Sequence, residues 1–330
     1  MDQPLPTQVS SPEVAFSDSI APIDAKRKLV LKRKFFFAGA ALLFAGTFVL
    51  GILAGRSVPA GIAAVLLFLL GIGVVCYAYF VLPTQEEISL QFKKKCIPQL
   101  LQKHGIEGVY TASHGLSVNS FLKAGLYHHR YSHFERYDGI IGRFENHPFG
   151  LYELAVQIAG GSNGIVGLPG VLPGHRTMTN YFYGWVLHIP VKDITGRTFV
   201  IPKFERASGE ADDWIETTRN HFRDNPAFEQ VQSGNPVFSR YYVIYSNDAS
   251  ETKKILNGNR LQFLIEAATL FESIPAFSFC GGRACMHLSI VDNSFDLELA
   301  TQFFPQGIEE ISGRLKFFCR AINALYGPGH

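Results

Sequence analysis

The chain has 330 residues and a formal net charge of +2, and only 18% of its residues are charged. Its second half has no concentrated basic face, which argues against nucleic acid as a partner. The five cysteines show no paired spacing, and they lie in the part of the chain that we assign to a membrane span and to the cytoplasm. An odd number of cysteines in that setting predicts free thiols rather than a disulfide framework.

Residues 1–25 are rich in Pro, Ser, Asp and Gln and contain few large apolar side chains. A segment of this composition cannot bury enough apolar surface to fold alone, so it predicts a disordered cytoplasmic tail.

Two uncharged apolar runs follow, residues 35–55 and 58–82. At about 1.5 Å per residue, each is long enough to cross a hydrocarbon core of roughly 30 Å. Only Arg56 and Ser57 separate them, so residues 26–83 predict a tight transmembrane hairpin. A signal peptide is an alternative for the first run, but 34 residues precede it and it exceeds the usual apolar core of a signal. A buried helix of a soluble protein is the alternative for either run.

Basic residues flank both outer ends of the hairpin, at positions 26–34 and 93–95, whereas the turn between the runs contains Arg56 alone. Cytoplasmic flanks carry the excess of Lys and Arg. We therefore expect a multi-pass protein of the bacterial cytoplasmic (inner) membrane with both termini in the cytoplasm.

Residues 84–330 predict a cytosolic domain. It begins with a helix in which Ile88, Phe92, Cys96 and Leu100 recur every four residues, with three lysines on another face. Pro98 predicts a kink or two short helices at this point. The apolar stripe fits packing on its own domain and also fits a surface helix on anionic lipid.

Farther along, short apolar segments alternate with turn residues. We expect strands over 139–145, 151–157, 181–190, 197–203 and 238–245, a hairpin over 276–279 and 284–291, and helices over 116–126, 214–223, 249–271 and 307–325. The last helix has an apolar stripe that includes Ile311, Leu315, Phe318 and Ile322. Mixed helices and hairpin strands predict an α+β fold with a largely antiparallel sheet and packed helices.

The order of these features resembles an uncharacterised family of bacterial membrane proteins, known only as a domain of unknown function. The similarity covers about residues 30–325 and rests on the hairpin and four later segments. These segments are Tyr137–Gly142 with Glu153, Val237–Asp248, Ala249–Leu256 and Phe277–Ser289. The resemblance implies no activity and no catalytic residue. It does imply that such proteins are companions of LemA-type membrane proteins. We therefore expect a LemA-type protein as an alternative partner to lipid.

The segment 160–174 repeats Leu-Pro-Gly and contains many glycines. No Lys follows it, and its spacing does not fit a phosphate-binding loop that opens a helix. We expect a flexible connection between two strands, and contact with lipid, a partner or a ligand stays an alternative.

Three histidines lie close together at His128, His129 and His133. A helix would bring His129 and His133 to one face, as in zinc sites, but no Glu occupies the required second position. A polar, half-exposed loop fits equally well.

The pair Cys280 and Cys285 encloses Gly281-Gly282, a strong turn signal. We expect the two thiols to face each other across a hairpin as free cysteines. His287 lies two residues after Cys285, on the same face of the strand. A catalytic pair, with Cys285 as nucleophile and His287 as base, is the less favoured alternative. The acidic pairs 212–213 and 309–310 predict helix starts. We assign no catalytic, cofactor-binding or metal-binding residue and no cofactor.

The resulting functional expectation is a membrane-anchored binding or scaffold domain that contacts a protein or the membrane surface, in envelope upkeep or trafficking. The alternative is a membrane-associated hydrolase or transferase with an unrecognised site. A transporter or channel subunit is less favoured, because neither span carries a charge.

Overall fold

The computed structural model describes residues 12–54, 58–112, 115–127, 133–159, 178–204, 213–271, 273–289 and 304–327. The chain divides into two compact units. The first comprises Met1–Gln99 with Asp296–Ile308, and the second comprises Leu100–Phe295 with Glu309–His330. We describe each unit by itself.

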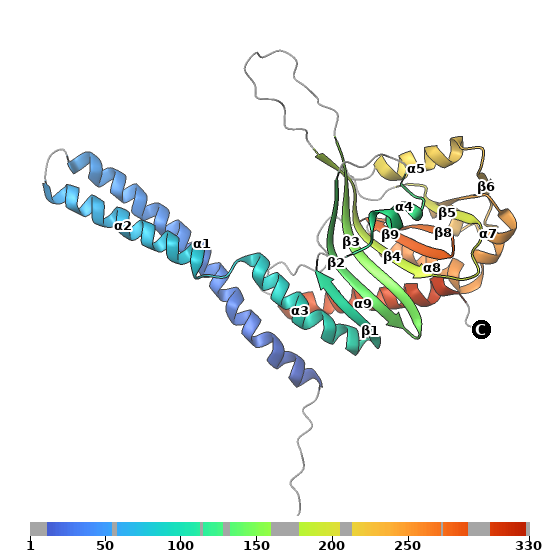
Figure 1. The fold of residues 1–330 in the computed structure, drawn as a ribbon, viewed down its shortest axis with the longest axis horizontal. Helices are drawn as coiled ribbons and strands as arrows, with labels where there is room; N and C mark the ends of the chain where they lie inside the picture. The colour runs from blue at the N-terminus through green and yellow to red at the C-terminus, as the bar shows by residue number, and fades with distance from the viewer. Residues whose placement is uncertain are drawn as a thin grey trace, which may run out of the picture. The chain divides into compact units, whose positions relative to one another are not determined.

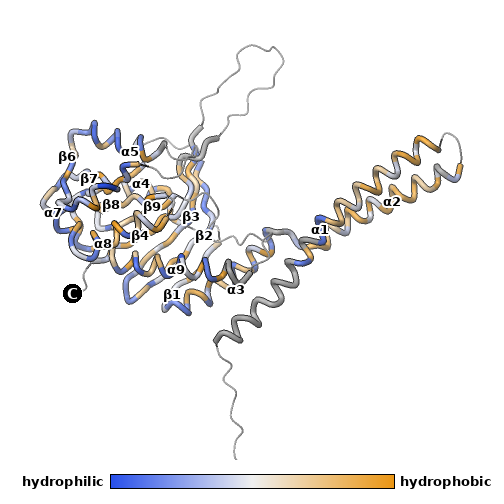
Figure 2. Tube along the Cα trace, turned by 180° about the vertical axis from the view of Figure 1, so that it is seen from behind, coloured by the Kyte–Doolittle hydropathy of each residue, from blue (hydrophilic) through white to orange (hydrophobic). Residues whose placement is uncertain are grey.

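The first unit contains two long apolar helices, α1 (Pro12–Ala54) and α2 (Val58–Phe80), which lie side by side (Figures 1 and 2). Ring pairs join them, including Phe44 and Phe68 with centroids 5.7 Å apart. Their outer faces remain apolar and exposed: Phe48 is 72% exposed. The segments Lys32–Leu53 and Gly61–Phe80 are long and apolar enough to cross a membrane. This agrees with the expected spans, while the turn at 55–57 lies outside the described residues.

The first helix begins earlier than the sequence suggested. It starts at Pro12, inside the segment 1–25 for which we expect a disordered tail. Proline suits the first position of a helix, because its missing N–H would have no partner there and its φ is already helical. Residues 1–11 lie outside the described part of the chain.

Helix α3 (Gln85–Lys103) opens with a capping box, in which Thr84 and Glu87 exchange hydrogen bonds between side chain and backbone at 2.9 and 3.1 Å. The predicted stripe is buried, with Phe92 only 1% exposed. The helix continues through Pro98, so the expectation of two short helices is wrong. Pro98 and Lys94 both lie on the exposed face. Water can therefore satisfy the Lys94 carbonyl that proline leaves without a donor.

In the described part of the chain, the second unit is built on a sheet of nine strands in the order β1-β2-β3-β4-β9-β8-β5-β7-β6, and all its neighbouring strands are antiparallel. The strands are β1 (Ile106–Ala112), β2 (His133–Phe144), β3 (His147–Ala159), β4 (Met178–Pro190), β5 (Arg197–Pro202), β6 (Glu229–Val231), β7 (Tyr242–Ser246), β8 (Ala276–Cys280) and β9 (Arg283–Ser289). The helices are α4 (Val118–Lys123), α5 (Asp213–Asp224), α6 (Phe238–Tyr241), α7 (Ala249–Ile255), α8 (Gly258–Leu270) and α9 (Phe304–Tyr326). The predicted α+β class with a largely antiparallel sheet is confirmed (Figure 1).

Apolar layers lie on both faces of the sheet. On one face, Phe121 of α4 and Trp214 of α5 belong to an aromatic cluster with Phe182 of β4. On the other face, Trp185 contacts Phe318 of α9 with ring centroids 5.9 Å apart. The α9 stripe is buried from Ile311 to Leu325, so this helix closes the core as predicted from its periodicity.

Two predicted elements divide in the structure. The expected strand 238–245 begins as the short helix α6, because the Asn235 side chain accepts hydrogen bonds from the backbone N–H groups of Val237 and Phe238. The expected helix 249–271 breaks between α7 and α8, where Gly258 has a φ of +44°. A residue with a side chain rarely adopts that conformation.

Strands β1 and β6 were not predicted. In β1, Gly108 lies opposite Gly142 of β2. A Cβ atom at Gly142 would lie 2.4 Å from the Glu107 carbonyl oxygen. Glycine at 142, within the Tyr137–Gly142 motif, therefore permits the close approach of the edge strand β1.

Candidate functional site

A cleft of about 530 Å³ lies where β5, β8 and β9 meet the ends of α4 and α5. Ligand pockets in proteins commonly occupy about 300–1,000 Å³, so this cleft has the size of a small-molecule site. We call it the β5–β8 cleft and define it by its lining residues: Leu122, Lys123, Gly125, Arg197, Phe199, His221, Phe222, Asn225, Phe228, Cys280, Gly281 and Arg283.

The register of the sheet brings two arginines to the cleft. Arg197 is the first residue of β5 and lies opposite Cys280, the last residue of β8. Gly281 and Gly282 then form a two-residue turn with φ values of +59° and +74°, and Arg283 opens β9. Positive φ at both turn residues is the geometry that two-residue hairpins favour. The hairpin thus fixes Arg283 close to the strand end that carries Arg197.

Aromatic rings form the apolar wall of the cleft. Phe199 of β5 stacks on Phe222 of α5, with centroids 4.2 Å apart and planes inclined by 26°. Phe228 packs edge-on against both rings at 5.5 and 5.0 Å. Gly125, after α4, has a φ of +77°, and a Cβ atom there would lie 3.0 Å from the Phe199 ring. Glycine therefore lets the end of α4 approach this wall.

The charges of the cleft are all of one sign. Lys123 and Arg197 are exposed and Arg283 is half-buried. Among the described residues that line the cleft there is no Asp or Glu. Several cations in a partly enclosed, low-dielectric site create a local positive potential that attracts anions.

The Cys280 thiol lies at the edge of this cleft and is half-buried. Burial raises its pKa, and the charges of Arg197 and Arg283 offset this rise only in part. The thiol form therefore predominates at neutral pH, and a thiol in that form is a poor nucleophile.

Cys280 and Cys285 are both free, as predicted. The expectation that they face each other is wrong, because Cys285 lies opposite Ser278 in the β8–β9 register. Only Gly281 and Gly282 form the turn, so each thiol has a different cross-strand neighbour.

His287 and Cys285 lie in the core rather than in the cleft. His287 is fully buried, and its Nδ1 atom lies 3.1 Å from the Tyr127 hydroxyl. Burial lowers the pKa of His287 to about 3 and raises the pKa of Cys285 to about 12. A protonated thiol beside a histidine of such low basicity does not make an activated nucleophile.

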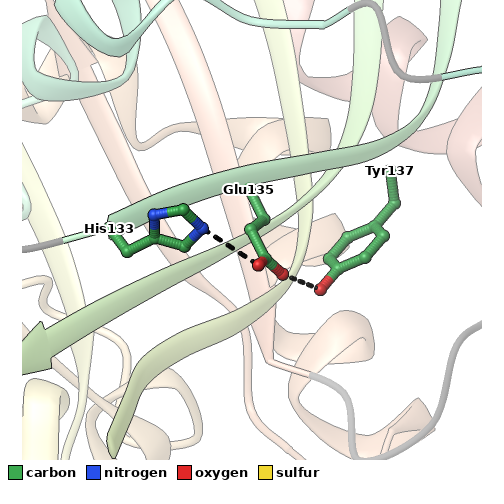
Figure 3. A network of polar contacts seen from close by, with 3 residues as sticks. All are labelled: His133, Glu135 and Tyr137. Carbon is green, nitrogen blue, oxygen red and sulfur yellow. Dashed lines mark hydrogen bonds and ion pairs between the residues drawn. The ribbon is translucent and has the colours of Figure 1, made fainter. Parts of the chain in front are cut away.

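A second polar group lies on β2, where His133, Glu135 and Tyr137 form a hydrogen-bonded network (Figure 3). His133 Nε2 lies 3.0 Å from Glu135 Oε1, and the Tyr137 hydroxyl donates to the other carboxylate oxygen. The hydrogen bond from Tyr137 lowers the pKa of Glu135, while burial, followed by Glu135, raises the pKa of Tyr137 to about 12. Both groups therefore keep their ordinary charge states at neutral pH.

The histidine segment does not form the helix that a zinc site would use, at least where it is described. His133 opens the strand β2, and His128 and His129 lie outside the described residues. Within the described ranges, no group of three His, Cys, Asp or Glu side chains is placed to hold a metal ion.

The remaining motifs are accounted for in part. The segment 160–174 lies outside the described residues. Asp213 is the first residue of α5, in agreement with a helix start. The expectation for Glu309 and Glu310 is wrong, because α9 begins at Phe304, and Glu310 instead pairs with Arg314 one turn later.

Comparison with known proteins gives a family match over part of the chain and no activity. Residues 180–326 match the family model described as "Protein of unknown function (DUF3137)". The match runs from Asn180 in β4 to Tyr326 at the end of α9, and it includes Arg197, Phe199 and Arg283 of the β5–β8 cleft. The match confirms similarity to an uncharacterised family over this part of the C-terminal domain, and the two apolar N-terminal helices agree with the hairpin expected for it.

No curated protein matches the chain. Among solved structures, a crystal structure of the mycobacterial trehalose monomycolate transport factor A, TtfA, is similar at a TM-score of 0.32 and 7% identity. The similarity covers 68% of this chain and 96% of that chain. At this TM-score, it adds nothing to the account of the site.

Proposed function

We propose that this protein is a membrane-anchored binding domain, in which the β5–β8 cleft receives a ligand without transforming it. The observation that carries the proposal is the cleft itself: about 530 Å³, cations from three separate elements and an aromatic wall. The Cys280 thiol in its described lining has a raised pKa, so the lining suits recognition better than nucleophilic chemistry.

The two apolar helices support attachment to a membrane, since their exposed apolar faces are stable only when water is excluded. We further propose that this is the bacterial inner membrane and that both termini are cytoplasmic, because basic residues flank the hairpin on its outer sides. We also propose a role in envelope upkeep or trafficking and, from the resemblance noted in the sequence, a LemA-type membrane protein as partner.

Native mass spectrometry of the full chain tests the proposal. The protein is purified from cells in lipid nanodiscs and released in the gas phase. We expect one small molecule bound per chain. The double variant Arg197→Glu, Arg283→Glu should lose it, and Arg240→Glu should keep it, because Arg240 is an exposed cation on α6, away from the cleft. Equal occupancy in all three proteins, or no bound molecule in the unaltered protein, would contradict the proposal.

A further inference from the structure

We infer that the ligand of the β5–β8 cleft is an organic phosphate, with its phosphate group on Arg197, Arg283 and Lys123 and its organic part on the aromatic wall. This inference rests on the proposed function and specifies the ligand class for the same site.

The charge of the cleft selects the phosphate. Two guanidinium groups and one ammonium group surround a space that no acidic side chain lines, among the described residues. Guanidinium groups bind phosphate oxygens through paired hydrogen bonds, and a phosphate monoester carries nearly two negative charges at neutral pH. A monocarboxylate would leave most of the positive charge of the cleft uncompensated.

A nearby carboxylate is already occupied. Glu251 of α7 lies against the segment that leads into Arg197, but its two oxygens accept hydrogen bonds from the Thr195 and Gly196 backbone and from the Thr195 hydroxyl, at 2.6–3.0 Å. It holds the entry to β5 in place and is absent from the cleft lining. Among the described residues, this carboxylate therefore does not compete for the cations of the cleft.

Hydrogen bonds to the backbone fix the positions of Arg197 and of the turn before Arg283. The Arg197 N–H donates to Asn247 Oδ1 at 2.7 Å. The turn before Arg283 is fixed at Gly282, which donates to the Ile194 carbonyl at 3.0 Å and accepts from the Val191 N–H at 2.8 Å. A site whose backbone is already ordered loses little conformational freedom on binding.

The aromatic wall requires an organic part on the ligand. Of the large apolar side chains that line the cleft, Phe199 and Phe222 are buried, whereas Phe228 and Leu122 are only half-buried. An apolar group placed there removes these surfaces from water, whereas inorganic phosphate would leave them exposed. The volume of the cleft, about 530 Å³, fits a small organic phosphate.

Binding of defined probes to the full chain in phosphatidylcholine nanodiscs tests the inference by calorimetry. We expect phenyl phosphate to bind at least about tenfold more tightly than inorganic phosphate, since only the former covers the wall. Benzyl alcohol, which lacks the charge, should bind at least about tenfold more weakly than phenyl phosphate.

Variants localise the site. Arg197→Gln and Lys123→Gln should each weaken phenyl phosphate binding about tenfold, because each removes one charged donor to the phosphate. Both side chains are exposed, so neither change should disturb the core. Arg240→Gln is the matched control and should bind as the unaltered protein does. Phe228→Ala should reduce the advantage of phenyl phosphate over inorganic phosphate.

The source of the phosphate is decided by monomeric dihexanoyl phosphatidic acid. Tighter binding than phenyl phosphate would identify a lipid headgroup, and weaker binding a water-soluble phosphate; both results support the inference. Equal binding of inorganic and phenyl phosphate, or equal losses in Arg197→Gln and Arg240→Gln, would overturn it. If native mass spectrometry shows a cleft-dependent ligand while no phosphate binds, the ligand class is wrong and the binding function stands.

Discussion

Replacement of Arg260 by leucine should destabilise the second unit, because this side chain joins three helices from inside the core. It is only 8% exposed, and it donates from Nη1 to the Ile255 carbonyl and from Nη2 to the Leu325 carbonyl, both at 2.9 Å. These carbonyls lie in the last turns of α7 and α9. A cation suits both positions, since each helix C-terminus carries a partial negative charge. The guanidinium also lies 5.5 Å from the centre of the Phe279 ring.

The magnitude follows from two opposing contributions. Two hydrogen bonds from a charged donor contribute about 1.5–3 kcal/mol each, and their loss leaves two buried carbonyls without a donor. Burial of the guanidinium, which lowers the Arg260 pKa to about 10, opposes this stabilisation. Leucine removes that cost, so we expect a net loss of about 2–4 kcal/mol in the free energy of unfolding.

Tryptophan fluorescence during thermal unfolding measures this change well. The chain has two tryptophans, and both Trp185 and Trp214 are buried in the second unit. A loss of this size should lower the Tm by roughly 5–15 °C in a unit of this length. The Tm of Arg260→Lys should lie between those of the unaltered protein and of Arg260→Leu, because one ammonium group cannot donate to both carbonyls at once. The control Arg240→Leu should change stability by less than about 0.5 kcal/mol. If Arg260→Leu lost no more stability than this control, the two hydrogen bonds of Arg260 would not contribute to the stability of the unit.

Four further predictions follow from the same structure. Reporter fusions at residue 20 and at the C-terminus should both show cytoplasmic activity, and a periplasmic signal from either would refute the proposed orientation. Leu315→Ala should cost about 2–5 kcal/mol by emptying a core site, whereas its exposed neighbour Lys316→Ala should cost under about 1 kcal/mol; similar small losses in chemical denaturation would show that the α9 stripe is not core. Burial lowers the pKa of His287 to about 3, below its value in the unfolded chain, so the unfolded state binds more protons in acid. Stability should therefore be fully present above pH 6.5 and fall as the pH drops toward 3, and a His287→Gln protein with an equally steep Tm profile would exclude this histidine as the cause. Replacement of Cys280 and Cys285 by serine should leave the fold intact, and mass spectrometry of the unaltered protein should find both thiols reduced; a disulfide there would contradict the assignment.

Periodicity predicted the elements whose burial pattern repeats along the sequence. The two apolar helices and the α9 stripe were visible because each has a long, regular run. Strand β1 was not, because Gly108 interrupts its alternation and its partner in the sheet decides its structure. Likewise, the Asn235 side chain accepts two backbone hydrogen bonds and so converts the start of an apparent strand into a helical turn.

The β5–β8 cleft could not be predicted in the same way. Arg197 and Cys280 are far apart in the sequence and become neighbours only through the pairing of β5 with β8. The aromatic wall likewise combines a strand, a helix and the segment after it. The one local signal was Gly281-Gly282, which indicated a turn. It did not indicate that this turn places Arg283 near Arg197. Arg260 gave no signal at all, since nothing in its sequence context indicates that it is buried.

The strand order has a consequence for how the protein is made. Strands β1 to β4 pair in the order of the sequence, so this half of the sheet can form soon after it leaves the ribosome. The free edge of β4 pairs with β9, which lies about one hundred residues farther along the chain: Val186 pairs with His287. At a synthesis rate of 5–20 residues per second, that edge waits roughly 5–20 s for its partner. During this interval, β4 presents a long apolar edge that can pair with other chains. Until β9 is synthesised, pairing of this edge with a neighbouring chain therefore competes with correct folding.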